Sequence, residues 1–520
     1  MQPGTPRSGP IWSASPSIGR LLSISLFLAV WLCPSAQVLA QPNQIQPYID
    51  RVVQQISEFT LDNGMKFIVM ERHQSPTVSF MTYVDVGSAY EQETKTGAAH
   101  FLEHLAFKGT PRIGTINYPA ERPLLDRLDQ LSDQLKTAQT QADQPAIEQL
   151  QQEFQSVKAA AASYVKQNEF GQIVQQAGGV GLNATTSADE TRYFYSFPAN
   201  KLELWMSLES ERFLEPVFRE FYEEKDVILE ERRMRSENSP IGKLIEAFLQ
   251  VALPDHPYGR PVIGYEADIR NLTRSDIQQL FDQYYTPDRI TMGIVGDVYP
   301  DQVKRLAQAY FGRYKAQSRA ADLTVAPPTQ TETRSVVVNL PAEPWYMEGY
   351  QRPGLTDPDD PVYDMIASLL TGGRTARLYQ TLVEQQQIAL GVQVDSTFPG
   401  DRYSNLLLVY AQTAPGHTIE EVATAIDAEL QRLKTEPISE AELDQVKTQT
   451  RAGLLQLLAS NQGMASLLPE YEAKTGSWRN LFDQLKTIDA ITAADVQRVA
   501  NQLFRAENLT IGKLLPPTGG

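Results

Sequence analysis

Two stretches of the chain repeat one order of polar and apolar positions. Residues 272–293 and residues 491–512 align without a gap. Each begins with a threonine that can cap a helix and an aspartate three residues later, continues with apolar residues at helical spacing, and ends in a β-branched run. The identical pairs are Thr273 and Thr492, Asp276 and Asp495, Gln278 and Gln497, Gln283 and Gln502, Thr291 and Thr510, and Gly293 and Gly512. The repeat predicts an α+β fold of two homologous domains, each an antiparallel-rich sheet packed with helices.

The chain is long enough to support two hydrophobic cores. It has 520 residues, of which 42% are hydrophobic, and a single core rarely extends over so long a chain. Residues 318–333 are rich in proline and threonine and lack an apolar period, as is typical of a linker. We therefore predict an N-terminal domain at residues 41–317 and a homologous C-terminal domain at residues 334–520.

The N-terminal domain carries an extra segment at about residues 119–170. Leucines recur at spacings of three and four from Leu124 to Leu135, and apolar residues recur in the same way from Ile147 to Tyr164. Between these runs, Ala142-Asp-Gln-Pro145 favours a chain reversal. The pattern predicts an antiparallel helical hairpin with a solvated, Gln-rich surface. Such a hairpin is compatible either with structural decoration or with a role in partner docking or gating.

The first 40 residues have the features of a signal peptide. Arg7 and Arg20 precede an apolar run from Leu21 to Leu32, and Val38-Leu39-Ala40 suits signal-peptidase cleavage before Gln41. The run is shorter than the roughly 20 apolar residues that a transmembrane helix needs. We expect export to the periplasm or another extracytoplasmic space, without stable membrane insertion after cleavage. An uncleaved N-terminal anchor is the alternative.

Cysteine usage and charge narrow the chemistry further. Cys33 is the only cysteine and lies in the leader, so the mature chain has no thiol or disulfide chemistry. Leu32 precedes it where a lipid-attachment signal needs a small side chain. The net charge of −17 argues against nucleic acid and against anionic membrane surfaces as partners.

Residues 97–110 contain two of the five histidines of the chain, His100 and His104. Their apolar neighbours at helical spacing predict a helix. On a helix the two imidazoles lie one turn apart on the same face, and Glu103 points to that face too. Two such imidazoles can bind one Zn²⁺, and the carboxylate can take a proton from water. Structural histidines on an amphipathic helix are the alternative.

A catalytic zinc site needs a third protein ligand and an open fourth position. Residues 221–237 form another predicted helix, on which Glu224 and Glu231 lie two turns apart and can both face the first helix. Such an acidic helix is also typical of a solvated surface paired with its own arginines. The residues alone do not favour Glu231 over Glu230 as the ligand.

The motif His100-Phe-Leu-Glu-His104 is an inverted zinc motif, and nearly all of the chain after the leader resembles the insulinase/pitrilysin family of zinc metallopeptidases, including its processing-peptidase branch. In that family a Glu-x6-Glu pair before an Arg-rich stretch completes the zinc site. The resemblance implies one Zn²⁺ per chain, with Glu231 as third ligand supported by Glu224, and Glu103 as general base. The family motif has about 76 residues between the last histidine and this glutamate. Here 127 positions separate His104 from Glu231, and the predicted hairpin accounts for the excess.

Residues 178–196 predict a Gly-rich turn followed by a strand. In the family this strand, here around Asn183 and Ala184, is an exposed edge that aligns peptide substrates by main-chain hydrogen bonds. Strand addition of this kind tolerates many substrate sequences, because it recognises backbone.

The second half departs from the metal pattern. Residues 372–383 resemble the C-terminal domain of the family but contain no histidine pair, so we expect no zinc there. Many relatives have a substrate-contacting arginine and tyrosine, seven residues apart, in the following helix. Those places are Val383 and Leu390 here. A separate metal-free homologue could supply the missing pair in a heterodimer, and a homodimer is the alternative.

These features together predict a zinc-dependent endopeptidase that hydrolyses peptides or small unfolded polypeptides. Two alternatives use the same fold. One is a catalytically silent scaffold, and the other is a peptide-binding protein that retains its ligand without turnover.

Overall fold

A computed structural model describes residues 42–316 and 319–517 of the chain. Both β-sheets lie in one compact unit of the chain, which begins at Ile49. The predicted signal peptide lies outside the described residues. No helix within the described ranges combines the length and apolar character needed to cross a membrane. The predicted domain boundaries and the linker at residues 318–333 remain sequence-based predictions.

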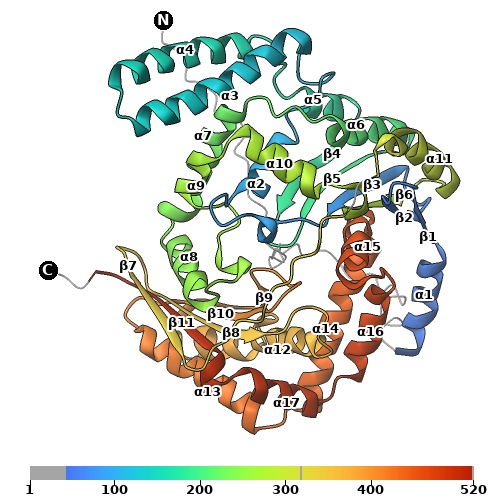
Figure 1. Ribbon diagram of the computed structural model, residues 1–520. Coiled ribbons are helices and arrows are strands. Elements are labelled where there is room, and N and C mark those ends of the chain that lie inside the picture. Colours follow the sequence, from blue (N-terminus) through green and yellow to red (C-terminus); the bar gives the residue numbers. More distant parts are fainter. Residues whose placement is uncertain (1–41, 317–318, 518–520) are drawn as a thin grey trace, which may run out of the picture. The chain divides into compact units, whose positions relative to one another are not determined.

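The first sheet has six strands in the order β1-β2-β6-β3-β5-β4. Only the β2–β6 pair is parallel. The strands are β1 (Ile56–Thr60), β2 (Lys66–Glu71), β3 (Thr77–Val84), β4 (Val180–Thr186), β5 (Thr191–Pro198) and β6 (Ile290–Gly296). Strand β4 therefore forms one edge of the sheet (Figure 1).

The second sheet has five strands in the order β7-β11-β8-β10-β9. The strands are β7 (Arg334–Asn339), β8 (Trp345–Arg352), β9 (Ala389–Phe398), β10 (Asn405–Thr413) and β11 (Leu509–Leu515). Its only parallel pair is β7–β11. Replacing β2, β6, β3, β5 and β4 by β7, β11, β8, β10 and β9 converts the first order into the second, with β1 as an addition. The predicted fold class, α+β with two equivalent sheets, is confirmed.

The repeated sequence pattern forms the same structure twice. Helix α10 begins after a capping box of Thr273 and Asp276 and leads into β6, and α17 begins after a capping box of Thr492 and Asp495 and leads into β11. In each box the threonine side chain accepts a hydrogen bond from the aspartate N–H, and the aspartate carboxylate accepts one from the threonine N–H. The polar pattern therefore fixes where each helix starts.

Seventeen α-helices are present in the described ranges. They are α1 (Pro42–Gln54), α2 (Ala98–Leu105), α3 (Tyr118–Thr140), α4 (Gln144–Ala162), α5 (Glu169–Gln176), α6 (Leu202–Leu214), α7 (Phe221–Arg232), α8 (Pro240–Ala252), α9 (Glu266–Asn271), α10 (Arg274–Tyr284), α11 (Pro300–Tyr310), α12 (Asp360–Thr371), α13 (Ile419–Thr435), α14 (Glu440–Ala459), α15 (Asn461–Thr475), α16 (Asn480–Ala490) and α17 (Ala493–Leu503).

Each sheet receives a helix from the other half of the chain. Helix α15 packs on β6 and β3, and α8 packs on β11 and β7. The matched glycines of the repeat lie at these contacts, because a Cβ on Gly293 would come 2.2 Å from the carbonyl oxygen of Ala465, and a Cβ on Gly512 would come 3.0 Å from the Phe248 ring. The missing side chains therefore allow the two halves to pack closely against each other.

Helices α3 and α4 form the expected hairpin, and Figure 1 shows them side by side. Ala142, with φ of 54°, lies in the short turn between them. Pro145 occupies the first turn of α4, where its missing N–H costs no hydrogen bond. The hairpin lies between the helix that carries the two histidines and strand β4 in the sequence.

Candidate metal centre

Helix α2 carries the histidine motif and has a fixed starting point. Its N-cap, Gly97, has φ of 87°, and a Cβ there would lie 2.5 Å from the Ile263 carbonyl oxygen. The carboxylate of Glu91 accepts hydrogen bonds from the N–H groups of Gly97 at 2.9 Å and Ala99 at 2.7 Å. Burial raises the pKa of Glu91 to about 8, although these two hydrogen bonds oppose the shift. The apolar face of α2, which includes Phe101 and Leu105, is buried in the first core.

Helix α7 lies against α2 and supplies the acidic side chains. The rings of Phe101 and Phe221 stack with centroids 4.6 Å apart, and Ile228 is fully buried in the same core. This packing turns Glu224 and Glu231, two helical turns apart, toward the histidines.

The three expected metal ligands lie together. Oε2 of Glu231 is 3.8 Å from Nε2 of His100 and 3.6 Å from Nε2 of His104, and one ligand atom from each residue lies within 4.8 Å of the other two. Tetrahedral zinc with ligands at about 2.0–2.1 Å places ligand atoms about 3.4 Å apart. The donor set and its spacing therefore fit a zinc ion. This is the only such group of His, Cys, Asp and Glu within the described residues.

A hydrogen bond at Nδ1, the ring nitrogen that does not face Glu231, orients the His104 imidazole. Its Nδ1 lies 3.1 Å from Oε2 of Glu224, and Glu224 also forms an ion pair with Lys108. A proton on Nδ1 that is donated to Glu224 leaves Nε2 free to bind a metal. Burial lowers the pKa of His104, but the hydrogen bond that its Nδ1 donates to Glu224 and the charges of Glu103, Glu224 and Glu231 outweigh burial and raise that pKa.

The surroundings of His100 favour its neutral form. Burial lowers its pKa well below the usual value, with smaller contributions in the same direction from His104 and Arg235. Its Nδ1 is buried, and no residue that the structure describes forms a hydrogen bond with it. A neutral imidazole is the form that binds a metal ion.

Glu103 lies on the same face and has one hydrogen-bond donor. The Oγ1 of Thr186, at the end of β4, donates to Oε2 of Glu103 at 2.5 Å. Burial raises the pKa of the Glu103 carboxyl, against the opposing effect of this hydrogen bond. A carboxyl with a raised pKa beside a metal site can both accept and return a proton.

The structure shows that the adjacent glutamates Glu230 and Glu231 of α7 have different surroundings. Glu230 pairs with Arg233 and its side chain is 53% exposed, whereas that of Glu231 is 17% exposed. The second carboxylate oxygen of Glu231 pairs with Arg235 at 2.7 Å. Arg235 belongs to a single π-helical turn, Arg233–Glu237, and such turns are frequent at functional sites.

Strand β4, with the predicted substrate residues Asn183 and Ala184, lies at the sheet edge beside α2. Among the described strands, β4 pairs only with β5, with a register irregularity between Val180 and Asn183. Ala184 is buried and Asn183 is half-buried. The outer row of β4 main-chain groups is therefore open to strand addition.

The second half places the expected Arg and Tyr positions on two different elements. Val383 lies in a π-helical segment, Tyr379–Gln385, but Leu390 lies in β9 and is 56% exposed. The expectation that both positions share one helix is wrong. Gln387 adopts φ of 54° and ends the helical segment before the strand begins.

The geometry of two equivalent sheets and one inverted histidine motif defines a class of metallopeptidase, and comparison with known families agrees. The family described as "Insulinase (Peptidase family M16)" matches residues 66–153, and that described as "Peptidase M16 inactive domain" matches residues 271–450. The first match contains His100, Glu103 and His104. The chain belongs to the insulinase family of metallopeptidases, peptidase family M16.

The matches to known relatives cover nearly the whole chain. The chain is 29% identical to the zinc protease PqqE of Helicobacter pylori over 507 residues, 96% of this chain and 99% of that protein. It is 22% identical to a probable mitochondrial-processing peptidase subunit beta of Arabidopsis thaliana over 471 residues, 88% of this chain and 78% of that protein. The crystal structure of a protease from Helicobacter pylori has a TM-score of 0.75 at 28% identity, and the match covers 89% of this chain and 99% of that one.

Sequence reasoning missed several residues around the metal centre. Thr186 lies two positions after Ala184, so strand alternation places both side chains on the face toward α2 and could have indicated it. Lys108 is four positions after His104 and could have been found by helical spacing. The sequence gives no signal for Arg219, because its partners come from a distant loop and from the inserted hairpin.

Proposed function

We propose that this protein is a zinc-dependent endopeptidase that hydrolyses peptides or small unfolded polypeptides. The observation that carries the proposal is the convergence of His100, His104 and Glu231 beside a buried glutamate, Glu103. One Zn²⁺ per chain would be held by the first three residues. There it would polarise the scissile carbonyl and lower the pKa of water.

Glu103 can transfer the proton that peptide hydrolysis requires. Glu103 accepts a proton from the attacking water as the new C–O bond forms, and then returns it to the amine as the C–N bond breaks. The products are a carboxylic acid and an amine, and Glu103 ends in its starting form. Glu224 holds His104 through Nδ1 and so keeps Nε2 directed at the ligand cluster.

The open edge at β4 supports an extended peptide as substrate. A peptide that adds to β4 would pair with main-chain groups near Asn183 and Ala184, next to the metal helix. Recognition of backbone requires an extended segment, so folded polypeptides are excluded unless they unfold locally.

A second, metal-free homologous subunit is the proposed partner. By the family resemblance, the arginine and tyrosine that contact substrate in many relatives correspond to Val383 and Leu390 here, although Leu390 lies in β9 and not in a helix. A partner that supplies this pair would complete the active chamber as a heterodimer, with a homodimer as the alternative. The leader predicts that the assembly acts in the periplasm or another extracytoplasmic space.

Zinc stoichiometry and cleavage of an unstructured peptide test the proposal together. We expect one zinc per chain, loss of cleavage with a chelator, and recovery with zinc. Glu103→Gln should retain zinc and peptide binding but lower kcat about a hundredfold or more. A wild-type chain that binds zinc and peptide without turnover, alone and with a homologous partner, would identify a peptide-binding protein. A chain that binds neither would identify a silent scaffold. Full activity of the isolated chain would refute the hypothesis that a separate, metal-free homologous subunit is needed.

A further inference from the structure

We propose that Thr186 is a positioning residue that holds the Glu103 carboxylate in place for proton transfer. This inference rests on the proposed peptidase function and assigns a residue to it. Thr186 lies at the end of β4, whereas Glu103 lies on α2, and 83 positions separate them in the sequence. Their contact joins the edge strand to the helix that carries the histidine motif.

The direction of the hydrogen bond follows from the neighbouring hydroxyl. Oγ1 of Thr186 lies 2.5 Å from Oε2 of Glu103 and 3.5 Å from Oγ1 of Thr191. Thr191 is fully buried and donates its own proton to the carbonyl oxygen of Val86 at 3.0 Å. The single Thr186 proton is therefore directed to Glu103, whose carboxylate accepts it in the form in which Glu103 acts as a base.

The main chain around Thr186 is fixed by a second loop. In the turn after β4, the carbonyl oxygen of Ser187 accepts from Ser88 N at 3.1 Å, and that of Ala188 accepts from Ala89 N at 2.9 Å. A Cβ on Gly87 would lie 2.4 Å from the same Ser187 oxygen, so this close approach needs glycine. Thr186 thus projects from a backbone that cannot shift freely, which makes its hydroxyl a rigid reference point for Glu103.

The same strand would contact the substrate and the base. Strand β4 offers its open main-chain edge to a peptide, while Thr186 on that strand holds Glu103. The scissile bond and the proton acceptor are therefore located by one element. Because the hydrogen bond restrains a base that reacts only after substrate has bound, its loss should affect turnover more than peptide binding.

Thr186→Val removes the donor with little change in volume, and Thr186→Ser retains it. We expect Thr186→Val to lower kcat about tenfold to a hundredfold while KM stays within about twofold, and Thr186→Ser to restore most of the lost rate. Zinc stoichiometry should remain one per chain. In a Glu103→Gln background, Thr186→Val should produce no further loss.

Thr82→Val is a matched control. Thr82, on β3 of the same sheet, donates its Oγ1 proton to Oε1 of buried Glu209 on α6 at 2.6 Å, so the control breaks an equivalent bond that involves none of the three candidate ligands. The proposal is overturned if Thr82→Val loses as much kcat as Thr186→Val, if Thr186→Val alters only KM, or if it leaves both constants unchanged.

A crystal structure of the metal-free Thr186→Val variant provides a readout that is independent of activity. We expect the Glu103 carboxylate to leave its wild-type position, and an unmoved carboxylate would overturn the proposal. If the wild-type chain shows no peptidase activity, the peptidase proposal fails. The structure then still decides whether Thr186 positions Glu103.

Discussion

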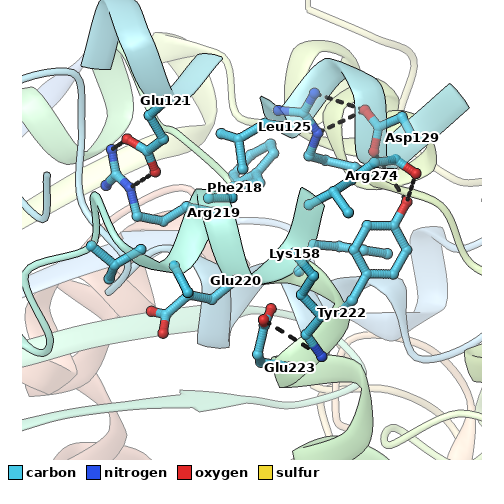
Figure 2. Close-up of a pocket in the computed structure, with 15 residues that line it drawn as sticks. Glu121, Leu125, Asp129, Lys158, Phe218, Arg219, Glu220, Tyr222, Glu223 and Arg274 are labelled. Atoms are coloured by element: carbon cyan, nitrogen blue, oxygen red, sulfur yellow. Dashed lines mark hydrogen bonds and ion pairs between the residues drawn. The ribbon is translucent and has the colours of Figure 1, made fainter. Parts of the chain in front are cut away.

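The guanidinium of Arg219 and the carboxylate of Glu121 form an ion pair in which both side chains are 0% exposed. Nε of Arg219 lies 2.9 Å from Oε1 of Glu121, which belongs to hairpin helix α3 (Figure 2). The remaining guanidinium nitrogens donate to the carbonyl oxygens of Lys108, Thr110 and Ile113, in the loop that follows α2. Arg219 itself lies just before α7. One side chain therefore connects the hairpin to both helices of the metal centre.

Arg219→Met should destabilise the fold strongly, because it leaves the Glu121 charge buried without a partner. We expect a loss of about 3–5 kcal/mol in the free energy of unfolding, measured by denaturant titration. Arg127→Met is the control, since the Arg127–Glu153 pair of the hairpin has side chains that are 34% and 41% exposed. An exposed pair contributes about 1 kcal/mol or less. Equal losses from the two variants would contradict the structural role of the buried pair.

Three glutamates of α7 should differ in their effect on zinc binding. Glu231→Gln removes the proposed third ligand and should abolish stable binding, while Glu224→Gln should weaken affinity about tenfold to a hundredfold because His104 loses its support. Glu230→Gln should bind as the wild type does, since Glu230 points to Arg233 at the surface. Competition with a chromogenic chelator measures all three. Normal zinc affinity in Glu231→Gln would exclude Glu231 as a ligand.

The two matched glycines should differ in their tolerance of alanine. In Gly293→Ala the new Cβ meets a backbone carbonyl oxygen at 2.2 Å, so the helix must shift, and we expect about 1–3 kcal/mol of destabilisation. In Gly512→Ala the nearest atom, at 3.0 Å, belongs to the Phe248 ring, which has to move by only a few tenths of an ångström. Thermal unfolding of both variants tests the difference. A Gly512→Ala loss that exceeds the Gly293→Ala loss would contradict the packing described for α15 and α8.

His256 should make the stability of the fold sensitive to acid. Burial lowers its pKa to about 4 from a usual 6.5, with a smaller contribution from Arg260 and an opposing one from Asp189. Its Nδ1 accepts a hydrogen bond from Tyr258 N, and its buried Nε2 has no hydrogen-bond partner within the described part of the chain. Between pH 6.5 and 4 the unfolded chain binds a proton at this position that the folded chain does not, so stability falls as the pH falls through that window.

His256→Asn tests this dependence, since the asparagine oxygen can replace Nδ1 as acceptor but does not titrate. From pH 7 to about pH 4, the wild type should lose about 1–2 kcal/mol of unfolding free energy relative to the variant. Denaturant titrations of the metal-free proteins measure the difference without a contribution from zinc release. If the unfolding free energies of the wild type and the variant change with pH in parallel, His256 is not the origin of the acid sensitivity.

Patterns within one helix or one repeat were predictable from the sequence. The spacing of His100, Glu103 and His104 places them on one helical face, and the Thr–Asp boxes mark the starts of α10 and α17. The proposal that Glu231 is a ligand required the family resemblance, because an acidic helix beside arginines does not show which face is buried. Its orientation depends on packing such as the Phe101–Phe221 stack, which joins residues 120 positions apart.

Contacts that depend on tertiary packing were not predictable. No local sequence pattern predicts that α8 packs on the second sheet and α15 on the first. The sequence does show Gly293 and Gly512 as a matched pair. Leu390 was assigned to a helix that ends earlier, because a single positive-φ residue, Gln387, terminates it and leaves no marked signal in the sequence. Thr186 pairs with Glu103 only because β4 lies beside α2.

The hairpin lengthens the path along the chain between two atoms that lie 3.6 Å apart, Nε2 of His104 and Oε2 of Glu231. For a flexible chain, extending the enclosed loop from about 76 residues to about 127 raises the entropic cost of closure by only about 0.5 kcal/mol, since that cost grows with the logarithm of length. Insertions at this position can therefore accumulate during evolution with almost no thermodynamic penalty to the metal-binding geometry. The base of the hairpin, fastened by Arg219, is the part that such insertions must preserve.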